Sequence, residues 1–234
     1  MRQVFYIFNK EFRSYFVSPI AYIVISIFLL ITGWFFFATF FLIDQASLRN
    51  FFSLLPFVFS FVVPAVTMRL FAEEFNVGSH EILMTLPVTF RQVILGKFLA
   101  GTAVVAALLF PTLAYALTVA LLGELDWGPV AGGYLGALLL GAAFAAIGLF
   151  ASSLTRNQIV AFIIGAAICF SLTLIDKVLF FLPQGLLGLL SFLGTESHFQ
   201  NIARGIIDSR DVLYFLSIVF VGLYGTHLAV EQKY

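Results

Sequence analysis

The stretch Arg69-Leu-Phe-Ala-Glu-Glu-Phe-Asn-Val-Gly-Ser-His-Glu-Ile-Leu-Met-Thr-Leu-Pro-Val-Thr-Phe-Arg91 is the most charged segment of a chain that otherwise consists of long apolar runs. Gly78 interrupts it, and Ser79 is a favoured N-cap for a following helix. Glu81 then falls in the first turn, where the positive end of the helix dipole favours a carboxylate, and Pro87 stops the helix early. The stretch therefore predicts a short helix of about two turns.

This predicted helix has an apolar face. Ile82, Leu83 and Leu86 follow the three-and-four spacing of an amphipathic helix. Because so short a helix is not stable alone in water, the face is expected to dock on another surface. The alternative is an ordinary solvated loop between two membrane spans.

The composition indicates a membrane protein. Hydrophobic residues make up 62% of the 234 residues, charged residues make up 10%, and the mean hydropathy is +1.07. These values are typical of polytopic membrane proteins, so we expect an all-α polytopic fold. The formal net charge of zero gives no information about nucleic acid, but the sequence has no basic run that would form a phosphate-binding face, so nucleic acid binding is not expected. Cys169 is the only cysteine, which excludes a disulfide or a thiolate metal site within the chain.

Residues 1–18 predict an amphipathic helix that lies in the membrane interface. Lys10, Arg13 and Ser14 occupy one side of it. Ser18-Pro19 is then expected to turn the chain into the bilayer. The predicted opposite face is aromatic and consists of Phe5, Phe8, Phe12, Tyr15 and Phe16.

Long uncharged runs predict the membrane spans, because crossing a hydrocarbon core takes about 20 helical residues. Two proline residues, Pro56 and Pro64, are expected to kink the second span. The coupling loop is expected at 69–97 and a cytosolic tail at 231–234. The six predicted spans are 19–43, 51–68, 98–123, 130–154, 158–175 and 212–230.

The run 178–195 is ambiguous, because it is uncharged but interrupted by one proline and several glycines. These breaks favour two short re-entrant helices, shielded by protein, over a seventh span. Residues 196–211 would then form an outer loop or a surface helix.

The fourth span carries small residues at helical spacing. Such a stripe lets another helix approach closely, so we interpret it as a packing surface, with a substrate groove as the alternative. The stripe consists of Gly141, Ala145, Gly148 and Ser152, and Gly132-x-x-x-Gly136 precedes it.

Basic residues set the predicted orientation. Eight lie on the predicted cytosolic side and four outside, which is the sense of the positive-inside rule and places both termini in the cytosol. The cytosolic set is Arg2, Lys10, Arg13, Arg69, Arg91, Lys97, Arg156 and Lys233, and the outer set is Arg49, Lys177, Arg204 and Arg210.

No catalytic motif is complete. Gly96-Lys97-Phe98 lacks the first glycine and the hydroxyl residue of a phosphate-binding loop. His80-Glu81 begins like a zinc-protease helix, but Met84 stands where the second histidine is required. Glu73 and Glu74 are adjacent, so they project from different sides of a helix and suit contacts with a partner or with basic residues of the loop rather than acid/base catalysis. We therefore predict no enzyme site, metal or cofactor in this chain.

The order of an arginine after the second span, a Glu-Glu pair, Gly-Ser-x-Glu-x-Leu and Leu-Pro resembles the cytosolic loop of type-2 ABC exporter permeases. The resemblance implies that the short helix is a coupling helix seated on a separate ATPase subunit, which holds the ATP and Mg. Arg156 would lie in a second cytosolic turn. The implied docking residues are Glu73, Glu74, Gly78, Ser79, Glu81, Ile82, Leu83, Leu86 and Pro87.

The start Phe-Tyr-Ile-Phe-Asn-Lys-Glu-Phe, residues 5–12, is most similar to the gliding-motility-associated and copper-maturation permeases. The family resemblance implies a second permease copy or homologue, two ATPase subunits, an outer-facing accessory protein and location in a bacterial-type inner membrane. The other class left open by the residues is a membrane scaffold or intramembrane enzyme without an ATPase.

Overall fold

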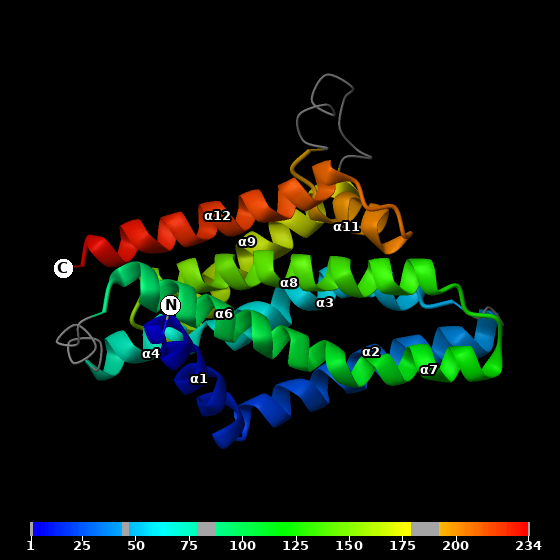
Figure 1. Cartoon of the computed structure of the whole chain (residues 1–234), viewed down its shortest axis with the longest axis horizontal. Coiled ribbons are helices and arrows are strands. Elements are labelled where there is room, and N and C mark those ends of the chain that lie inside the picture. Colours follow the sequence, from blue (N-terminus) through cyan, green and yellow to red (C-terminus); the bar gives the residue numbers. More distant parts are fainter. Residues whose placement is uncertain (1, 44–46, 79–87, 179–191, 234) are drawn as a thin grey trace.

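The computed structural model describes residues 2–43, 47–78, 88–178 and 192–233, and no strand occurs in these ranges. Six helical stretches in them are long and apolar enough to cross a membrane, which confirms the predicted all-α polytopic fold (Figure 1). The elements are α1 (Arg2–Val17), α2 (Ile20–Ile43), α3 (Arg49–Thr67), α4 (Arg69–Val77), α6 (Phe90–Leu109), the 3-10 turn η1 (Phe110–Thr112), α7 (Leu113–Leu122), α8 (Trp127–Leu154), α9 (Gln158–Val178), α11 (Thr195–Ala203) and α12 (Ser209–Glu231).

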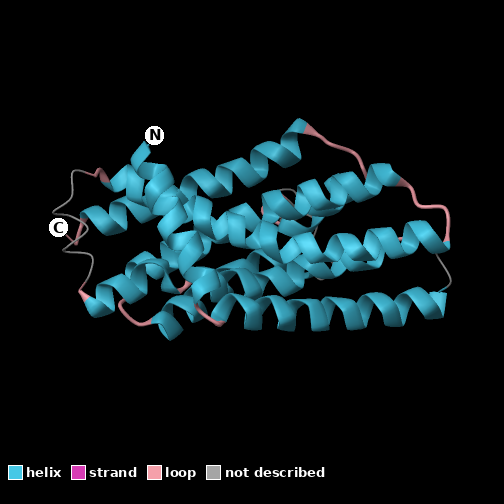
Figure 2. Ribbon diagram, turned by 60° about the horizontal axis from the view of Figure 1, so that its bottom comes forward, coloured by secondary structure: helices cyan, strands magenta, loops and turns pink. Residues whose placement is uncertain are grey.

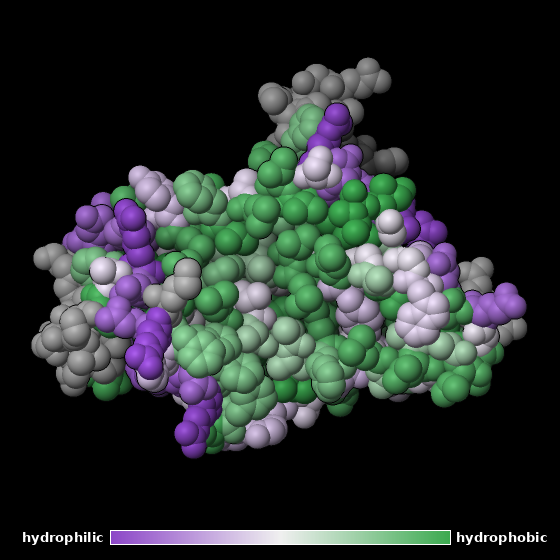
Figure 3. Space-filling model, in the orientation of Figure 1, coloured by the Kyte–Doolittle hydropathy of each residue, from purple (hydrophilic) through white to green (hydrophobic). Residues whose placement is uncertain are grey.

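Both chain termini lie at one end of the bundle, together with α4 and the start of α6 (Figures 1 and 2). We call this the terminal end and the other the opposite end. Between them, apolar side chains form a continuous belt, while hydrophilic residues gather toward the two ends (Figure 3). The bundle therefore has the hydropathy profile of a protein that crosses a bilayer along its long axis.

Helix α8 is the central span. It is the most buried of the six and packs against α3, α6, α9, α11 and α12. By contrast, α2, α9 and α12 bury only a minor share of their residues. Their open sides are available to lipid or to other protein chains.

The second helical stretch extends beyond the predicted span at 51–68. α3 leads through Met68 directly into α4, so Arg69 begins a new helix instead of a loop. Leu70, Phe71 and Phe75 are buried. Burial of this apolar face favours helix over loop despite the neighbouring charges.

The third stretch begins earlier than the predicted span at 98–123. Helix α6 starts at Phe90, where the Gln92 side-chain oxygen accepts a hydrogen bond from the Thr89 amide at 3.0 Å. This is the reciprocal half of a capping box, a signal that the sequence contained. Most of the predicted loop 69–97 is thus helical, and only residues 78–89 lie between α4 and α6, of which 79–87 are outside the described residues.

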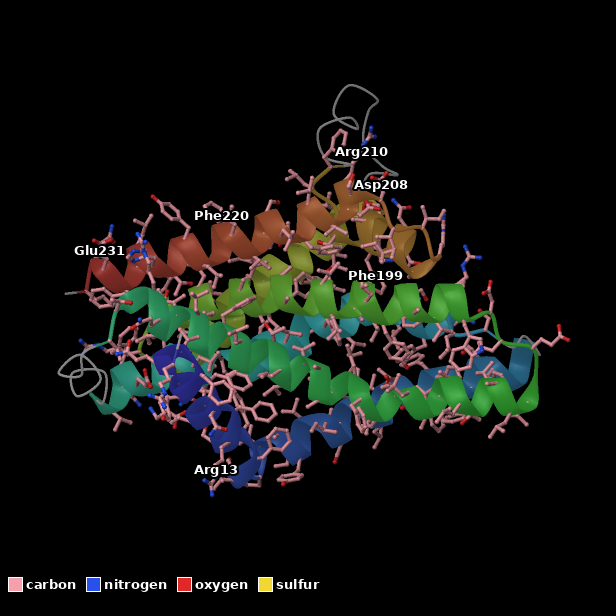
Figure 4. The ribbon with its side chains drawn as sticks, viewed as in Figure 1. Arg13, Phe199, Asp208, Arg210, Phe220 and Glu231 are labelled. Atoms are coloured by element: carbon pink, nitrogen blue, oxygen red, sulfur yellow. The ribbon has the colours of Figure 1, made fainter. Side chains whose placement is uncertain are left out.

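The small residues of α8 lie at helix contacts, which supports the packing interpretation of the stripe. A Cβ on Gly148 would overlap the Thr67 hydroxyl of α3, and one on Gly141 would overlap Val105 of α6. The Gly132-x-x-x-Gly136 pair faces α11, where Phe199 is fully buried on the side toward α8 (Figure 4). These glycines let backbones approach more closely than any side chain would allow.

The end of α9 and the start of α11 are in direct contact. An Asp176 carboxylate oxygen accepts hydrogen bonds from the backbone amides of Glu196 at 2.8 Å and Ser197 at 3.2 Å. Lys177 pairs with Glu196 at 3.0 Å. Residues 179–191 lie outside the described residues, so the re-entrant helices remain a prediction.

Candidate functional site: the α4 junction

Helix α4 is where the charged stretch meets the bundle. It lies at the terminal end, directly before the residues predicted to dock on a partner. Gly78 ends it with φ of 76°, in the left-handed region that favours glycine. Four elements bond to α4, and we call α4 with these bonded residues the α4 junction.

Lys97 of α6 forms the centre of this junction. Its ammonium group lies 2.8 Å from a Glu74 carboxylate oxygen of α4 and 3.1 Å from a Glu11 carboxylate oxygen of α1. It also donates a 2.6 Å hydrogen bond to the Leu70 carbonyl of α4. Lys10 stands at the solvent edge, 3.6 Å from Glu11 and 3.7 Å from Glu74. We call Lys10, Glu11, Glu74 and Lys97 the Lys97 cluster.

Three members of the cluster, Lys97, Glu11 and Glu74, are largely buried, and exposed Lys10 completes its charge balance. The Lys97 side chain is 1% exposed, and those of Glu11 and Glu74 are 11% and 14% exposed. An ammonium group has three donors, and two carboxylates and one carbonyl accept from them. Removing one partner of such a buried set costs about 3 to 5 kcal/mol, because a charge is left without compensation. The cluster therefore holds α1, α4 and α6 together.

A second set of contacts joins α1 to the α3–α4 boundary. The buried Tyr15 hydroxyl donates to the Val66 carbonyl at 2.8 Å. The Arg69 guanidinium lies 4.7 Å from the centre of the Tyr15 ring and donates to Ser14 at 3.1 Å. Burial raises the pKa of Tyr15 well above its usual range, although nearby Arg69 opposes the shift. The phenol therefore stays a neutral donor.

The position of Tyr15 corrects the predicted aromatic face of α1. The other four aromatic residues do form one continuous row of ring contacts, and Phe5 is 66% exposed. Tyr15 instead belongs to the buried face, with Ile7 and Glu11. The four-residue spacing of these three residues places them on one side of the helix, opposite lipid-facing Phe5.

Ser152 joins the end of α8 to α4. Its hydroxyl accepts from the amides of Phe71 at 2.9 Å and Ala72 at 3.0 Å, and donates to the Met68 carbonyl at 2.8 Å. The first four amides of a helix lack partners within it. Ser152 thus caps α4 from another helix.

The C-terminal residues complete the junction. Lys233 donates to the Ser153 carbonyl at 2.7 Å and lies 4.2 Å from the centre of the Phe75 ring. Partial burial, together with the nearby positive charge of Arg156, lowers the pKa of Lys233. Arg156, predicted in a second cytosolic turn, is exposed between α8 and α9 on this side of the bundle.

The predicted docking residues therefore divide into two groups. Glu73 pairs with Arg69 at 3.5 Å and is half exposed, whereas Glu74 is buried against Lys97, so both contact basic residues of the stretch. Gly78 ends α4. The remaining residues, Ser79, Glu81, Ile82, Leu83, Leu86 and Pro87, lie outside the described residues.

Sequence reasoning missed Glu11, Ser152 and Lys97 as members of one site. One signal was present in α1, where Glu11 is the only acid of the helix and lies four residues from both Ile7 and Tyr15. An acid on an otherwise apolar face indicates a buried partner. Nothing in the local sequence identified that partner, because Lys97 is 86 residues away.

The described ranges contain no group of three or more metal-ligating side chains. The α4 junction can act mechanically: polar contacts link α4 to α1, α6 and α8, exposed Lys233 lies over the Phe75 ring of α4, and residues 79–87 follow α4 immediately.

Comparison with protein families gives one match. A model described as "ABC-2 family transporter protein" matches residues 5–191, which is most of the chain and includes the whole α4 junction except its C-terminal contact. Comparison with curated proteins gives no match.

Proposed function

Because the chain belongs to the ABC-2 transporter family and is thus a permease subunit of an ABC transporter, we propose that a separate ATPase docks on residues 79–87 and drives it through the α4 junction. ATP and Mg would be held by that ATPase. The substrate is exported, or force is transmitted across the membrane, when the ATPase moves α4.

The main observation that supports the proposal is the buried ion pairing of Lys97. Lys97 bonds α4 to both α1 and α6, at 2.8 Å through Glu74 and 3.1 Å through Glu11. A displacement of α4 would therefore have to move the interfacial helix and the third span or break a buried ion pair. A solvated loop needs no buried charge network, so the burial of Lys97 favours a mechanical role for α4 over an ordinary loop.

Motion of α4 would reach the other spans through two connections. Ser152 connects α4 to the central helix α8, and α3 continues into α4 with one intervening residue. Since α8 packs on five other elements, motion of α4 would reach most of the bundle. Interfaces packed this closely shift between discrete arrangements and do not deform continuously.

The proposed assembly follows the family. Two permease copies or homologues would pair, two ATPase subunits would bind beneath them, and an outer-facing accessory protein would bind opposite. The terminal end would be cytosolic in a bacterial-type inner membrane, consistent with the distribution of basic residues. We place the chain in the gliding-motility or copper-maturation branch on the similarity of residues 5–12.

Leu83→Arg tests the docking step. It would place an unpaired charge at the proposed contact, which is expected to cost at least a few kcal/mol of binding. We expect the variant to insert in the membrane and pair normally but to lose co-purification of the ATPase. Glu81→Gln should weaken association only slightly, by about 0.3 to 1 kcal/mol.

Val88→Arg is the control, because it adds the same charge just beyond Pro87; Val88 packs partly buried against the core, so membrane insertion of this variant is measured as well. The variant should leave ATPase association unchanged. Full association and transport-linked turnover in Leu83→Arg would refute docking on residues 79–87.

A further inference from the structure

A cavity of about 510 Å³ lies at the opposite end of the bundle, away from the α4 junction. It lies among the start of α3, the turn between α7 and α8, and the end of α11. Its size falls within the range of about 300 to 1,000 Å³ that is usual for small-ligand sites. The interior walls include apolar Leu48, Phe52 and Val130, which are all buried.

Charged side chains of both signs line this cavity. Arg49 and Arg204 contribute two guanidinium groups, and Glu124 and Asp126 contribute two carboxylates. None of these four residues takes part in an ion pair within the described ranges. The two guanidinium groups and Glu124 are therefore available to a ligand, whereas one Asp126 carboxylate oxygen already accepts from the Gly128 amide at 3.1 Å and caps α8, which leaves its other oxygen for a ligand.

The backbone around the cavity strengthens this separation of charge. Arg49 is the first residue of α3, and its amide donates to the Ser47 hydroxyl at 3.1 Å, so the positive dipole end of α3 adjoins the Arg49 guanidinium. An anion is favoured at such a helix start, next to a guanidinium. Glu124 and Asp126 instead lie in the turn before α8, so the anionic groups come from a different element.

The cavity lies where lipid headgroups are expected. Exposed Trp127 follows Asp126, and exposed Leu121 and Leu122 precede the turn. Tryptophan next to exposed leucines is typical of the boundary between hydrocarbon and headgroups. Hydrophilic residues also replace the apolar belt toward this end of the molecule (Figure 3).

We propose that this cavity binds the headgroup of a zwitterionic phospholipid, with its phosphate on Arg49 and Arg204 and its ammonium group on Glu124 and Asp126. Guanidinium groups match phosphate oxygens through paired hydrogen bonds, and carboxylates accept from an ammonium group. The apolar wall at Phe52 receives the glycerol and the first acyl carbons. A purely anionic headgroup would satisfy the arginines but leave both carboxylates facing negative charge.

The test uses the full-length permease in detergent, with native mass spectrometry to count retained lipid. Phosphatidylethanolamine and phosphatidylglycerol with identical acyl chains are added in equal amounts. We expect the wild-type chain to retain phosphatidylethanolamine preferentially. Arg204→Glu should lower that retention about tenfold, as expected for one lost charge-assisted contact.

Glu124→Lys separates binding from a folding defect. It removes an ammonium partner and adds a phosphate partner, so preference should shift from phosphatidylethanolamine toward phosphatidylglycerol. A misfolded chain would lose both lipids. Arg210→Glu is the control, because Arg210 is an exposed arginine at the start of α12 that does not line the cavity (Figure 4).

Three outcomes would overturn the proposal. The first is equal retention of both lipids by the wild-type chain. The second is an equal loss of lipid in Arg204→Glu and Arg210→Glu. The third is displacement of the lipid by soluble phosphoethanolamine at matching concentration, which would assign the cavity to a soluble zwitterion. The measurement needs no ATPase, so its failure leaves the proposed docking on residues 79–87 untouched.

Discussion

The ammonium group of Lys97 lies 2.8 Å from the carboxylate of Glu74, although one residue belongs to the third span and the other to α4. Only 1% of the Lys97 side chain is exposed, so protein encloses the ammonium group near the start of α6. A charge in this position is tolerated only with partners, so the pair ties the position of α4 to that of α6.

Lys97→Met should therefore destabilise the permease strongly. It removes the buried ammonium partner of Glu11 and Glu74, and we expect a loss of about 3 to 5 kcal/mol in the free energy of unfolding. Denaturation of the purified chain in mixed micelles measures this. Lys177→Met, which removes the exposed partner of Glu196, should cost less than about 1 kcal/mol.

A triple variant separates the structural from the mechanical role of the cluster. Replacement of Lys97 by Met and of Glu11 and Glu74 by Leu removes the buried charges together, which is often neutral for stability. We expect stability to recover while substrate-linked ATPase turnover stays low. Recovery of both would show that the buried ions do not transmit force.

Ser152→Ala should loosen α4 from α8. It leaves the amides of Phe71 and Ala72 without their acceptor, and an unsatisfied buried group costs about 1 to 3 kcal/mol. Faster hydrogen exchange at these two amides is the direct readout. Ser153→Ala is the control, because that hydroxyl bonds only to Phe150 of its own helix. Equal exchange in both variants would contradict the role given to Ser152.

Gly148→Ala tests the closest approach of α8 to α3. The added methyl would overlap the Thr67 hydroxyl, and such overpacking typically costs about 1 to 3 kcal/mol. Thr67→Ala in the same chain should recover part of the loss, as a double-mutant cycle would measure. Gly128→Ala is the control, since its nearest contact is Asp126 at an ordinary 3.4 Å. No difference between the two single variants would argue against tight packing.

The membrane spans were accessible to sequence reasoning because their cause is local. A run such as 130–154 is uncharged throughout and mostly apolar, and composition alone predicts a helix in lipid. Helix α4 was missed because the charged residues Arg69, Glu73 and Glu74 placed this segment in the predicted loop 69–97. Burial of Phe71 and Phe75 outweighs that signal, and burial depends on helices elsewhere in the chain.

The α4 junction was only partly predictable for the same reason. Gly78 carries its own conformational signal, and the structure places it at the end of α4. Lys97 gives no such signal, since a lysine beside a span usually faces phosphate headgroups. Its burial results from carboxylates that are 23 and 86 residues distant in sequence, and such pairings follow from the fold and not from spacing.

The topology at α11 can be tested by thiol labelling. In a Cys169→Ala background, Arg210→Cys should react rapidly with an impermeant reagent from outside, because Arg210 is exposed at the start of α12 (Figure 4). Glu196→Cys should react from the same side but more slowly, since Glu196 is mostly buried. Arg156→Cys should react only from the cytosol. Labelling of Arg210→Cys solely from the cytosol would refute six spans.

The charge balance of the Lys97 cluster has a consequence for energy supply. Lys10 and Lys97 contribute two positive charges and Glu11 and Glu74 two negative ones. A membrane potential does work of about 2.3 kcal/mol per elementary charge at 100 mV, but only on net charge that crosses the field. Moving the neutral cluster with α4 therefore transfers no gating charge. If α4 moves as proposed, the Lys97 cluster itself adds no voltage dependence to ATPase turnover, which measurements in energised and depolarised membranes would check.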